Sequence, residues 1–176
     1  MGMMSRTALA AVLAAGGWMA MASAVAQSNG GCTLEQVGGT ERHSIRCASG
    51  LTAIAEAGAA YTLLDRDGNG ETDGIKLDGK ALLLEFPDGG APAGFEVITP
   101  QAIAAVRGTR WIVAADAGKT SVFVRRGSVA VTRVSGDQGV TLAPGDGVDV
   151  ETGAEPLTVR QWPAARVAAM MARFGQ

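Results

Sequence analysis

The clearest indication of the fold is the stretch Thr120–Val134, with the sequence TSVFVRRGSVAVTRV. Valines stand at positions 122, 124, 129 and 131, and polar residues alternate with them on both sides of Gly127. An apolar period of two residues is typical of a strand with one buried face. Phe123 is the exception, because it falls in the polar phase. We interpret the stretch as two short strands joined by a turn at Gly127.

Similar runs continue in both directions from this stretch and end at Gly, Asp or Pro at intervals of about 8 to 12 residues. The predicted strands are 52–57, 60–64, 74–77, 81–86, 96–98, 109–114, 120–125, 128–134, 140–142 and 147–151. This pattern predicts an all-β fold, either a β-roll or solenoid or a sandwich of short strands. Both arrangements bury alternating valines, so the choice between them stays open.

Two segments break the strand pattern. Residues 100–106 fit one or two helical turns, with Thr99 as the N-cap and Pro100 at the first helical position. In the tail, residues 163–174 predict a short amphipathic helix whose apolar stripe is Val167, Met170, Met171 and Phe174. We expect this helix to pack on its own domain; docking on a partner is the alternative.

The first 26 residues have the pattern of a signal peptide. Arg6 precedes an apolar run, and Ala24-Val25-Ala26 fits the small-residue cleavage rule. We expect cleavage before Gln27 and a periplasmic or secreted protein with no transmembrane segment afterwards. An uncleaved membrane anchor and a lipid anchor on Cys32 are the less favoured alternatives.

The two cysteines, Cys32 and Cys47, are the only ones in the chain. An exported protein enters an oxidising compartment, which favours a disulfide between them. The bridge would close residues 27–50 into an N-terminal hairpin that turns at Gly38-Gly39-Thr40. Two buried free thiols are the alternative.

Residues 98–150 resemble the FecR-domain family of periplasmic all-β modules. The matching residues are Thr99-Pro100, Val106-Arg107-Gly108-Thr109, Trp111, Val113, Val122, Val124, Gly127, Val129, Val131 and Leu142-Ala143-Pro144-Gly145. The resemblance implies a FecR-like β domain over 51–152, followed by a tail over 153–176. FecR proteins relay the state of an outer-membrane transporter across the inner membrane. Because no span follows the leader, we expect this chain to correspond to the periplasmic part alone.

Arg107, Gly108, Thr109 and Trp111 form the candidate binding site. Gly108 permits a sharp backbone corner, after which Trp111 and Val113 face the core together. The planar guanidinium of Arg107 suits either a structural clamp on carbonyls or carboxylates, such as Glu96 or Asp116, or a contact with an anionic partner. Both interpretations stay open.

The loop 65–73, DRDGNGETD, carries a candidate calcium site. Oxygen ligands at loop positions 1, 3, 5, 7 and 9 are Asp65, Asp67, Asn69, the Glu71 carbonyl and Asp73, and a glycine stands at position 6. Position 12 is a lysine rather than the bidentate glutamate of a complete EF-hand loop. The same residue types also form tight solvated turns, which is the alternative interpretation.

Composition excludes several classes of function. The chain has 15 Lys+Arg, 17 Asp+Glu, a net charge of −2 and a pI near 5.4, which argues against nucleic-acid binding. The single histidine, His43, has no motif partner, and neither a nucleophile elbow nor zinc spacing is present, so we expect no enzyme. Arg125, Arg126 and Arg133 form the main basic concentration, and we expect Arg125 and Arg133 on the solvent side, either as a protective edge or as a contact for an anionic partner.

Taken together, these patterns predict an exported, non-catalytic binding or regulatory and signalling module of the cell envelope, with an envelope protein or glycan as its partner. Trp162 is expected to cap the core rather than stack on a sugar. The alternative function is a calcium-stiffened structural or surface-adhesion protein.

Overall fold

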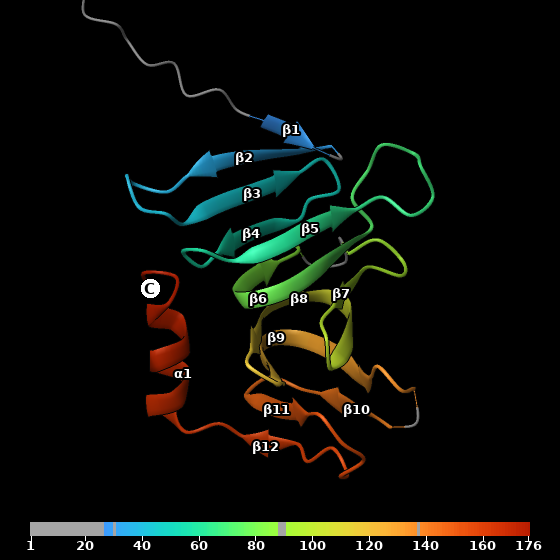
Figure 1. The fold of residues 1–176 in the computed structure, drawn as a ribbon. Helices are drawn as coiled ribbons and strands as arrows, with labels where there is room; N and C mark the ends of the chain where they lie inside the picture. Colours follow the sequence, from blue (N-terminus) through green and yellow to red (C-terminus); the bar gives the residue numbers. More distant parts are fainter. Residues whose placement is uncertain (1–26, 30, 88–90, 137) are drawn as a thin grey trace, which may run out of the picture.

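Three long strands organise the fold in a computed structural model that describes residues 27–29, 31–87, 91–136 and 138–176. Side chains are described from residue 31 onward except at 107–109, and the predicted signal peptide lies outside the described residues. The strands are β1 (Gln27–Asn29), β2 (Cys32–Gln36), β3 (His43–Cys47), β4 (Thr52–Ala55), β5 (Ala60–Leu64), β6 (Gly74–Glu85), β7 (Glu96–Ile98), β8 (Ala102–Asp116), β9 (Lys119–Arg133), β10 (Gly139–Leu142), β11 (Asp146–Glu151) and β12 (Arg160–Gln161), and the helix is α1 (Ala164–Ala172). Figure 1 shows the strands stacked from β1 to β12, with α1 standing against one side.

The long strands β6, β8 and β9 each take part in two layers. The first layer contains β4, residues 80–85, 110–116 and 119–126 of the long strands, and β11, and it continues through β3, β2 and β1. The second layer contains β5, β7, β10 and the remaining halves of the long strands. The all-β prediction is confirmed, and the two layers joined by bent strands form a roll.

Each long strand bends at the point where its core-facing residues change between even and odd positions. In β9, buried valines stand at even positions up to Val124 and at odd positions from Val129. In β8 the core-facing residues change from even to odd positions across a register shift between Arg107 and Arg110. In β6 the change comes next to Lys80, which adopts a φ of 67°. One extra residue at a bulge bends a strand and keeps the same face inside, so the sheet folds over itself.

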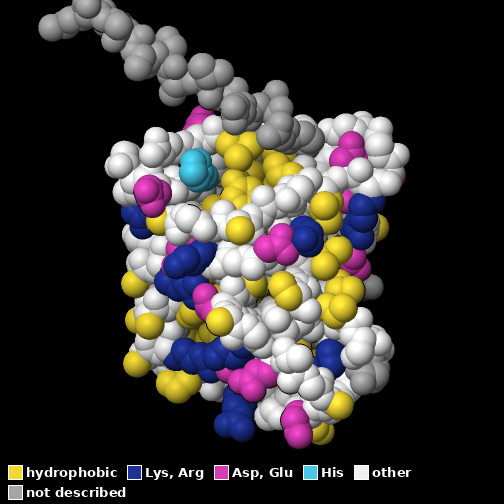
Figure 2. Space-filling model, in the orientation of Figure 1, with side chains coloured by type: hydrophobic (Ala, Val, Ile, Leu, Met, Phe, Trp, Pro, Cys, Tyr) yellow, Lys and Arg dark blue, Asp and Glu magenta, His cyan; other side chains and the backbone are white. Residues whose placement is uncertain are grey.

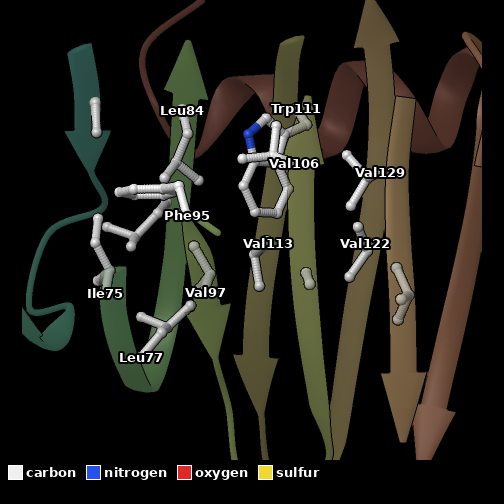
Figure 3. Packing of buried hydrophobic residues seen from close by; sticks show 14 of the residues in the cluster. Ile75, Leu77, Leu84, Phe95, Val97, Val106, Trp111, Val113, Val122 and Val129 are labelled. Atoms are coloured by element: carbon white, nitrogen blue, oxygen red, sulfur yellow. The ribbon is translucent and has the colours of Figure 1, made fainter. Parts of the chain in front are cut away.

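The core fills the space between the two layers. Figure 3 shows Leu84, Trp111, Val113, Val122 and Val129 pointing into this common space. Residues of both halves of each long strand belong to one buried cluster, in which Trp111 is 0% exposed. The predicted inward direction of Trp111, Val113 and the valines of β9 is therefore confirmed.

Three local predictions are wrong. Residues 102–106 belong to β8 and not to a helix, because Thr99 and Pro100 instead form a tight turn in which the Thr99 N–H donates to the Ala102 carbonyl at 2.8 Å. Proline is as favourable at the second position of such a turn as at the start of a helix. Gly127, with a φ of 79°, bends the continuous strand β9 rather than ending it. Arg133 is buried instead of solvent-facing and donates to the carbonyls of Glu151 and Glu155.

The N-terminal hairpin and the tail follow their predictions more closely. A disulfide joins Cys32 and Cys47, which are opposed partners in the β2–β3 pair. Helix α1 packs on its own domain, and Met171 and Phe174 of its predicted stripe are buried. The described part of the chain has no helix that is long and apolar enough to cross a membrane.

Candidate functional site

Helix α1 covers one half of the outer face of the first layer. This face presents Leu83, Ile112 and Phe123 to the helix. Trp162, 8% exposed, stacks on Phe123 with ring centroids 5.2 Å apart, so it caps the core as predicted. A Cβ at Gly147 would lie 2.2 Å from the indole ring, so the absence of a side chain there makes room for Trp162.

Ion pairs attach the two ends of this helical segment to the sheet. Arg173 contacts Glu56 at 2.6 Å and Asp116 at 3.1 Å. Arg166 lies over the Trp162 ring at 3.6 Å and donates to Asp149 Oδ1 at 2.6 Å. Burial raises the pKa of Asp149, but hydrogen bonds from Arg166 and Ser121 outweigh it and hold the pKa below its usual range.

A groove of about 430 Å³ opens in the other half of the same face, where α1 does not reach. Strands β2, β3, β4, β6 and β8 contribute to its walls, and Figure 1 shows β2 and β3 continuing past the C-terminal end of the chain. Ile54 and Leu83 give it an apolar floor, while its polar walls include Glu35, Ser44 and Arg46. Its volume and its mixed lining are typical of a binding pocket.

A row of polar residues crosses four strand pairs along the groove. The register places Arg46 opposite Thr52, Thr52 opposite Glu85, Glu85 opposite Arg110, and Arg110 opposite Arg126. Directly opposed residues point to the same face of a sheet. We call these five residues the arginine row. The row contains three arginines, one threonine and one glutamate.

The charges of the arginine row are unevenly paired. Glu85 lies 3.3 Å from Arg126 Nη2 and 3.6 Å from Arg110 Nε. Arg110 also donates to the side-chain oxygen of Gln176 at 2.6 Å, although its Nε is buried without a hydrogen-bond acceptor. Among the described residues, none forms an ion pair or hydrogen bond with the side chain of Arg46. Arg46 is therefore the arginine of the groove for which the described residues provide no counter-charge.

The predicted binding residues do not line this groove. Trp111 is in the core, and its neighbours Arg107, Gly108 and Thr109 lie at the β8 bulge, where their side chains are outside the described part of the structure. The two carboxylates suggested for an Arg107 clamp have other partners, since Glu96 contacts Arg66 at 2.9 Å and Asp116 contacts Arg173. A binding role for Arg107, Gly108 and Thr109 stays a prediction.

The acidic loop is held together by its own hydrogen bonds. Asp65 accepts from the N–H groups of Asn69 and Gly70, and the Asp67 carboxylate accepts from Asn69. Asn69 in turn accepts from the Glu71 N–H at 2.7 Å. Within the described ranges, no group of three or more His, Cys, Asp or Glu side chains has an arrangement suited to a metal ion.

Asp73, the last predicted calcium ligand, forms hydrogen bonds with Arg66 instead. Its carboxylate accepts from the Arg66 backbone N–H at 2.9 Å and from Arg66 Nε at 3.0 Å. Hydrogen bonds to Glu96 and Asp73 raise the pKa of the Arg66 guanidinium. Calcium binding by Asp65, Asp67, Asn69, Glu71 and Asp73 stays a prediction.

His43 is exposed on β3, and the histidine is visible on the upper part of the face that Figure 2 draws. No described carboxylate pairs with it. On the face that Figure 2 draws, acidic and basic side chains are interspersed.

Comparison with known proteins identifies the family. A model of the family described as FecR protein matches residues 36–130, more than half of the chain. The chain belongs to the FecR family. FecR proteins are regulatory rather than enzymatic and are associated with the cell envelope. The match begins inside the hairpin and ends within β9.

Two crystal structures share the fold of this FecR protein. Both are described as a "putative anti-sigma factor" from Parabacteroides distasonis, and both are 22% identical to the chain. One has a TM-score of 0.60 over 80% of the chain, and the other a TM-score of 0.59 over 79%. The chain spans 64% of the length of each. A search among curated proteins finds no match.

The groove and the arginine row were not predicted from the sequence. Their residues come from six strands, and only strand register brings them together. The alternating pattern of each strand marks which residues face outward, but it does not say which outward residues are neighbours.

Proposed function

We propose that this FecR protein is an exported, non-catalytic module that binds a protein partner in the periplasm and serves regulation or signalling there. The observation that carries the proposal is the family match over residues 36–130. FecR proteins are regulatory, and regulation of this kind requires protein–protein contact.

Two features support the periplasmic location. The leader pattern of residues 1–26 directs a chain to export. The Cys32–Cys47 bridge joins opposed strands, and disulfides persist in oxidising compartments such as the periplasm.

The non-catalytic role is supported by the placement of the groups that catalysis would use. His43 is exposed and has no described carboxylate partner that would orient it as a general base. Glu85 and Glu96, two acids that could act in acid–base catalysis, are each paired with arginine.

Export is tested by expressing the full chain with a C-terminal tag in a Gram-negative host and fractionating the cells. We expect the protein in the periplasmic fraction, with an N-terminus at Gln27 by mass spectrometry and no free thiol after alkylation. Full-length protein in the cytosol, with both cysteines alkylated, would contradict the proposal.

Partner binding is tested in the native envelope with photo-crosslinking residues placed singly at exposed positions of both layers. We expect a discrete crosslinked species from at least one position that disappears without illumination. If no position gives an adduct while the protein is folded and periplasmic, the binding role is wrong.

A further inference from the structure

The two layers of the roll end at different places on the side of β6 that faces away from β8. There the first layer continues from β6 through β4, β3, β2 and β1, whereas the second layer ends with β5. Figure 1 shows β1, β2 and β3 extending past β5. The N-terminal hairpin therefore overhangs the last strand of the second layer, and beyond β5 no strand of the described residues lies opposite its core-facing side.

Strand β5 is an open edge of the second layer. It pairs with β6 on one side, and within the described residues no backbone group of Tyr61, Thr62 or Leu63 bonds to a partner on the other side. Both the N–H and the carbonyl groups of a strand alternate between its two sides, so the outer side of β5 presents donors and acceptors. Its sequence, AYTLL, has neither a charge nor a proline, which are devices that natural proteins use to block an edge.

The other edge strands of the described sheet are shorter. β1 has three residues and β12 has two, whereas β5 has five. β10 has four, and the tail reaches its start, where the Gln138 side chain bonds to the Ala154 carbonyl at 2.8 Å and to the Leu157 N–H at 3.2 Å. The edge best suited to pairing with a further strand is therefore β5.

Incompletely covered apolar side chains lie on both sides of the gap between β5 and the overhanging hairpin. Four of them pack against the main core cluster and remain only partly buried: Leu34, Cys47, Tyr61 and Leu63. Figure 2 shows hydrophobic side chains on the upper part of the drawn face, where β2 and β3 lie in Figure 1. We call the outer side of β5 together with the core-facing side of β2 and β3 the open step.

The overhang argues against pairing of β5 with β5 of a second copy. Two copies of one strand that pair antiparallel are related by a two-fold axis perpendicular to the sheet, so the first layers of both copies lie on the same side. Because β4 and β5 both flank β6, β4 lies opposite β5, and β3 lies opposite the next strand position. Neighbouring strands are about 4.8 Å apart, so β3 of one copy and β4 of the other would occupy the same place. The open step accepts a strand that brings no such layer with it.

We propose that an extended segment of a partner protein adds to β5 as a further strand and covers the core-facing side of β2 and β3. The inference rests on the proposed function and names the surface and the mode of binding. Side chains alternate between the two faces of a strand, so every second residue of the segment faces Leu34 and is apolar, while the others face solvent. Main-chain hydrogen bonds give affinity in such a complex, and the apolar positions give specificity.

The direct test is fluorescence anisotropy with the purified mature protein and labelled peptides of about eight residues that alternate Val and Thr, long enough to span β5. One version carries N-methyl groups on its Val nitrogens and the other on its Thr nitrogens, so each can pair along only one of its edges. We expect one version to bind saturably at concentrations up to about 1 mM and the other at least about tenfold more weakly. Equal affinities, or no binding by either, would overturn the inference.

The variants Leu63→Lys and Val140→Lys locate the binding. Both replace a partly buried residue on an edge strand of the second layer, Leu63 on β5 and Val140 on β10. A lysine at such a position keeps its charge in water only while no further strand covers it. We expect Leu63→Lys to weaken binding by about tenfold or more and Val140→Lys by less than about twofold. Equal weakening would mean that the added charge acts from a distance and that β5 is not the site.

A milder substitution keeps this test valid if circular dichroism shows that Leu63→Lys is not folded. Thr62 is exposed, so Thr62→Lys adds a charge to the edge without entering the core. Its matched control is Thr141→Lys, which is exposed on β10. We expect the same order of effects, with weakening of about threefold or more for Thr62→Lys. Unchanged binding in a folded Thr62→Lys variant would overturn the inference.

Tyr61 gives an independent measurement, because it is the single tyrosine of the chain and lies on β5. The peptides contain no tyrosine, so acetylation by N-acetylimidazole, followed by mass spectrometry, reports on the open step alone. We expect saturating peptide to lower the rate of Tyr61 acetylation to about half or less. An unchanged rate would place the bound peptide elsewhere.

Photo-crosslinking in cells separates failure of this inference from failure of the proposed function. A crosslinker at Thr62 reports on β5, and one at Thr141 reports on β10. Adducts of Thr62 with another protein that Leu63→Lys abolishes support the inference. Adducts that join two copies of the chain through Thr62 overturn the choice of partner. Adducts only from positions away from β5 leave the binding role intact but overturn the open step as its site, and no adduct from any exposed position contradicts both.

Discussion

The covered and open halves of the outer face of the first layer use arginine in opposite ways. In the covered half, Arg173 has two carboxylates and Arg166 has one, together with the face of Trp162. In the open half, Arg46 has no described partner and Arg110 shares its carboxylate. The same sheet face therefore carries fully paired arginines where the chain folds back on itself, and in Arg46 an arginine without a described counter-charge where it does not.

This contrast separates arginines that stabilise the fold from an arginine that does not. A guanidinium whose carboxylates are present within the chain is part of the folded structure, and its loss leaves an acid uncompensated. An exposed guanidinium without a described partner contributes little to stability, so its loss should leave the fold intact. Substitutions of paired residues in the covered half should consequently lower stability, whereas substitution of Arg46 in the open half should not.

Trp162→Ala should cause the largest loss of stability. The indole is buried, stacked on Phe123 and seated over Gly147, so its removal leaves a cavity between the tail and the sheet. We expect the free energy of unfolding from urea denaturation to fall by about 3 kcal/mol, with about half that loss for Trp162→Phe. A loss below about 1 kcal/mol would mean that the covered half contributes little to the fold.

Arg173→Gln and Arg46→Gln compare the two halves directly. Removing Arg173 leaves Glu56, whose side chain is 17% exposed, without its cation, so we expect a loss of about 2 kcal/mol. Arg46→Gln should change the unfolding free energy by less than about 0.5 kcal/mol, because no described group depends on it. Equal losses, measured by urea denaturation under the same conditions, would remove the distinction between the halves.

Asp149→Asn should reveal a pH-dependent contribution of the covered half. The pKa of Asp149 is lowered in the folded protein, so its charged form stabilises the fold above the ordinary aspartate range and this stabilisation is lost as the pH falls through and below about 4. We expect Asp149→Asn to cost about 1 kcal/mol at pH 7 and progressively less as the pH approaches 3. A deficit that is constant from pH 7 to pH 3 would show that the carboxylate charge is not involved.

Much of the roll could be predicted from the alternation of apolar residues and the spacing of Gly, Asp and Pro between the strands. The predicted β5 and β7 coincide with the observed strands, and the inward valines of β9 and the apolar stripe of α1 follow their patterns. The continuity of β9 was missed because Gly127 has the features of a turn. The distinguishing signal is the odd spacing from Val124 to Val129, since a phase change of one residue marks a bulge within a strand.

The candidate site was harder to predict for a physical reason. Arg46, Glu85 and Arg110 are far apart in the chain and become neighbours only through the register of three strand pairs. Arg107, which the family motif emphasised, lies instead at the bulge where β8 passes between layers. A motif marks where the backbone is constrained, whereas a binding surface formed across strands leaves no local pattern.

Calcium should produce the smallest effect on stability, and it tests whether the acidic loop 65–73 binds a cation. If Asp65, Asp67 and Asn69 bind calcium, the loop must exchange internal hydrogen bonds for the ion, and Asp73 must leave Arg66 to join them. We therefore expect affinity in the millimolar range and a rise in melting temperature of only about 2 °C at about 5 mM calcium. Magnesium at the same concentration and the variant Asp67→Asn are the controls, and an equal response to both ions would show that the loop is a solvated turn whose acids are neutralised by screening alone.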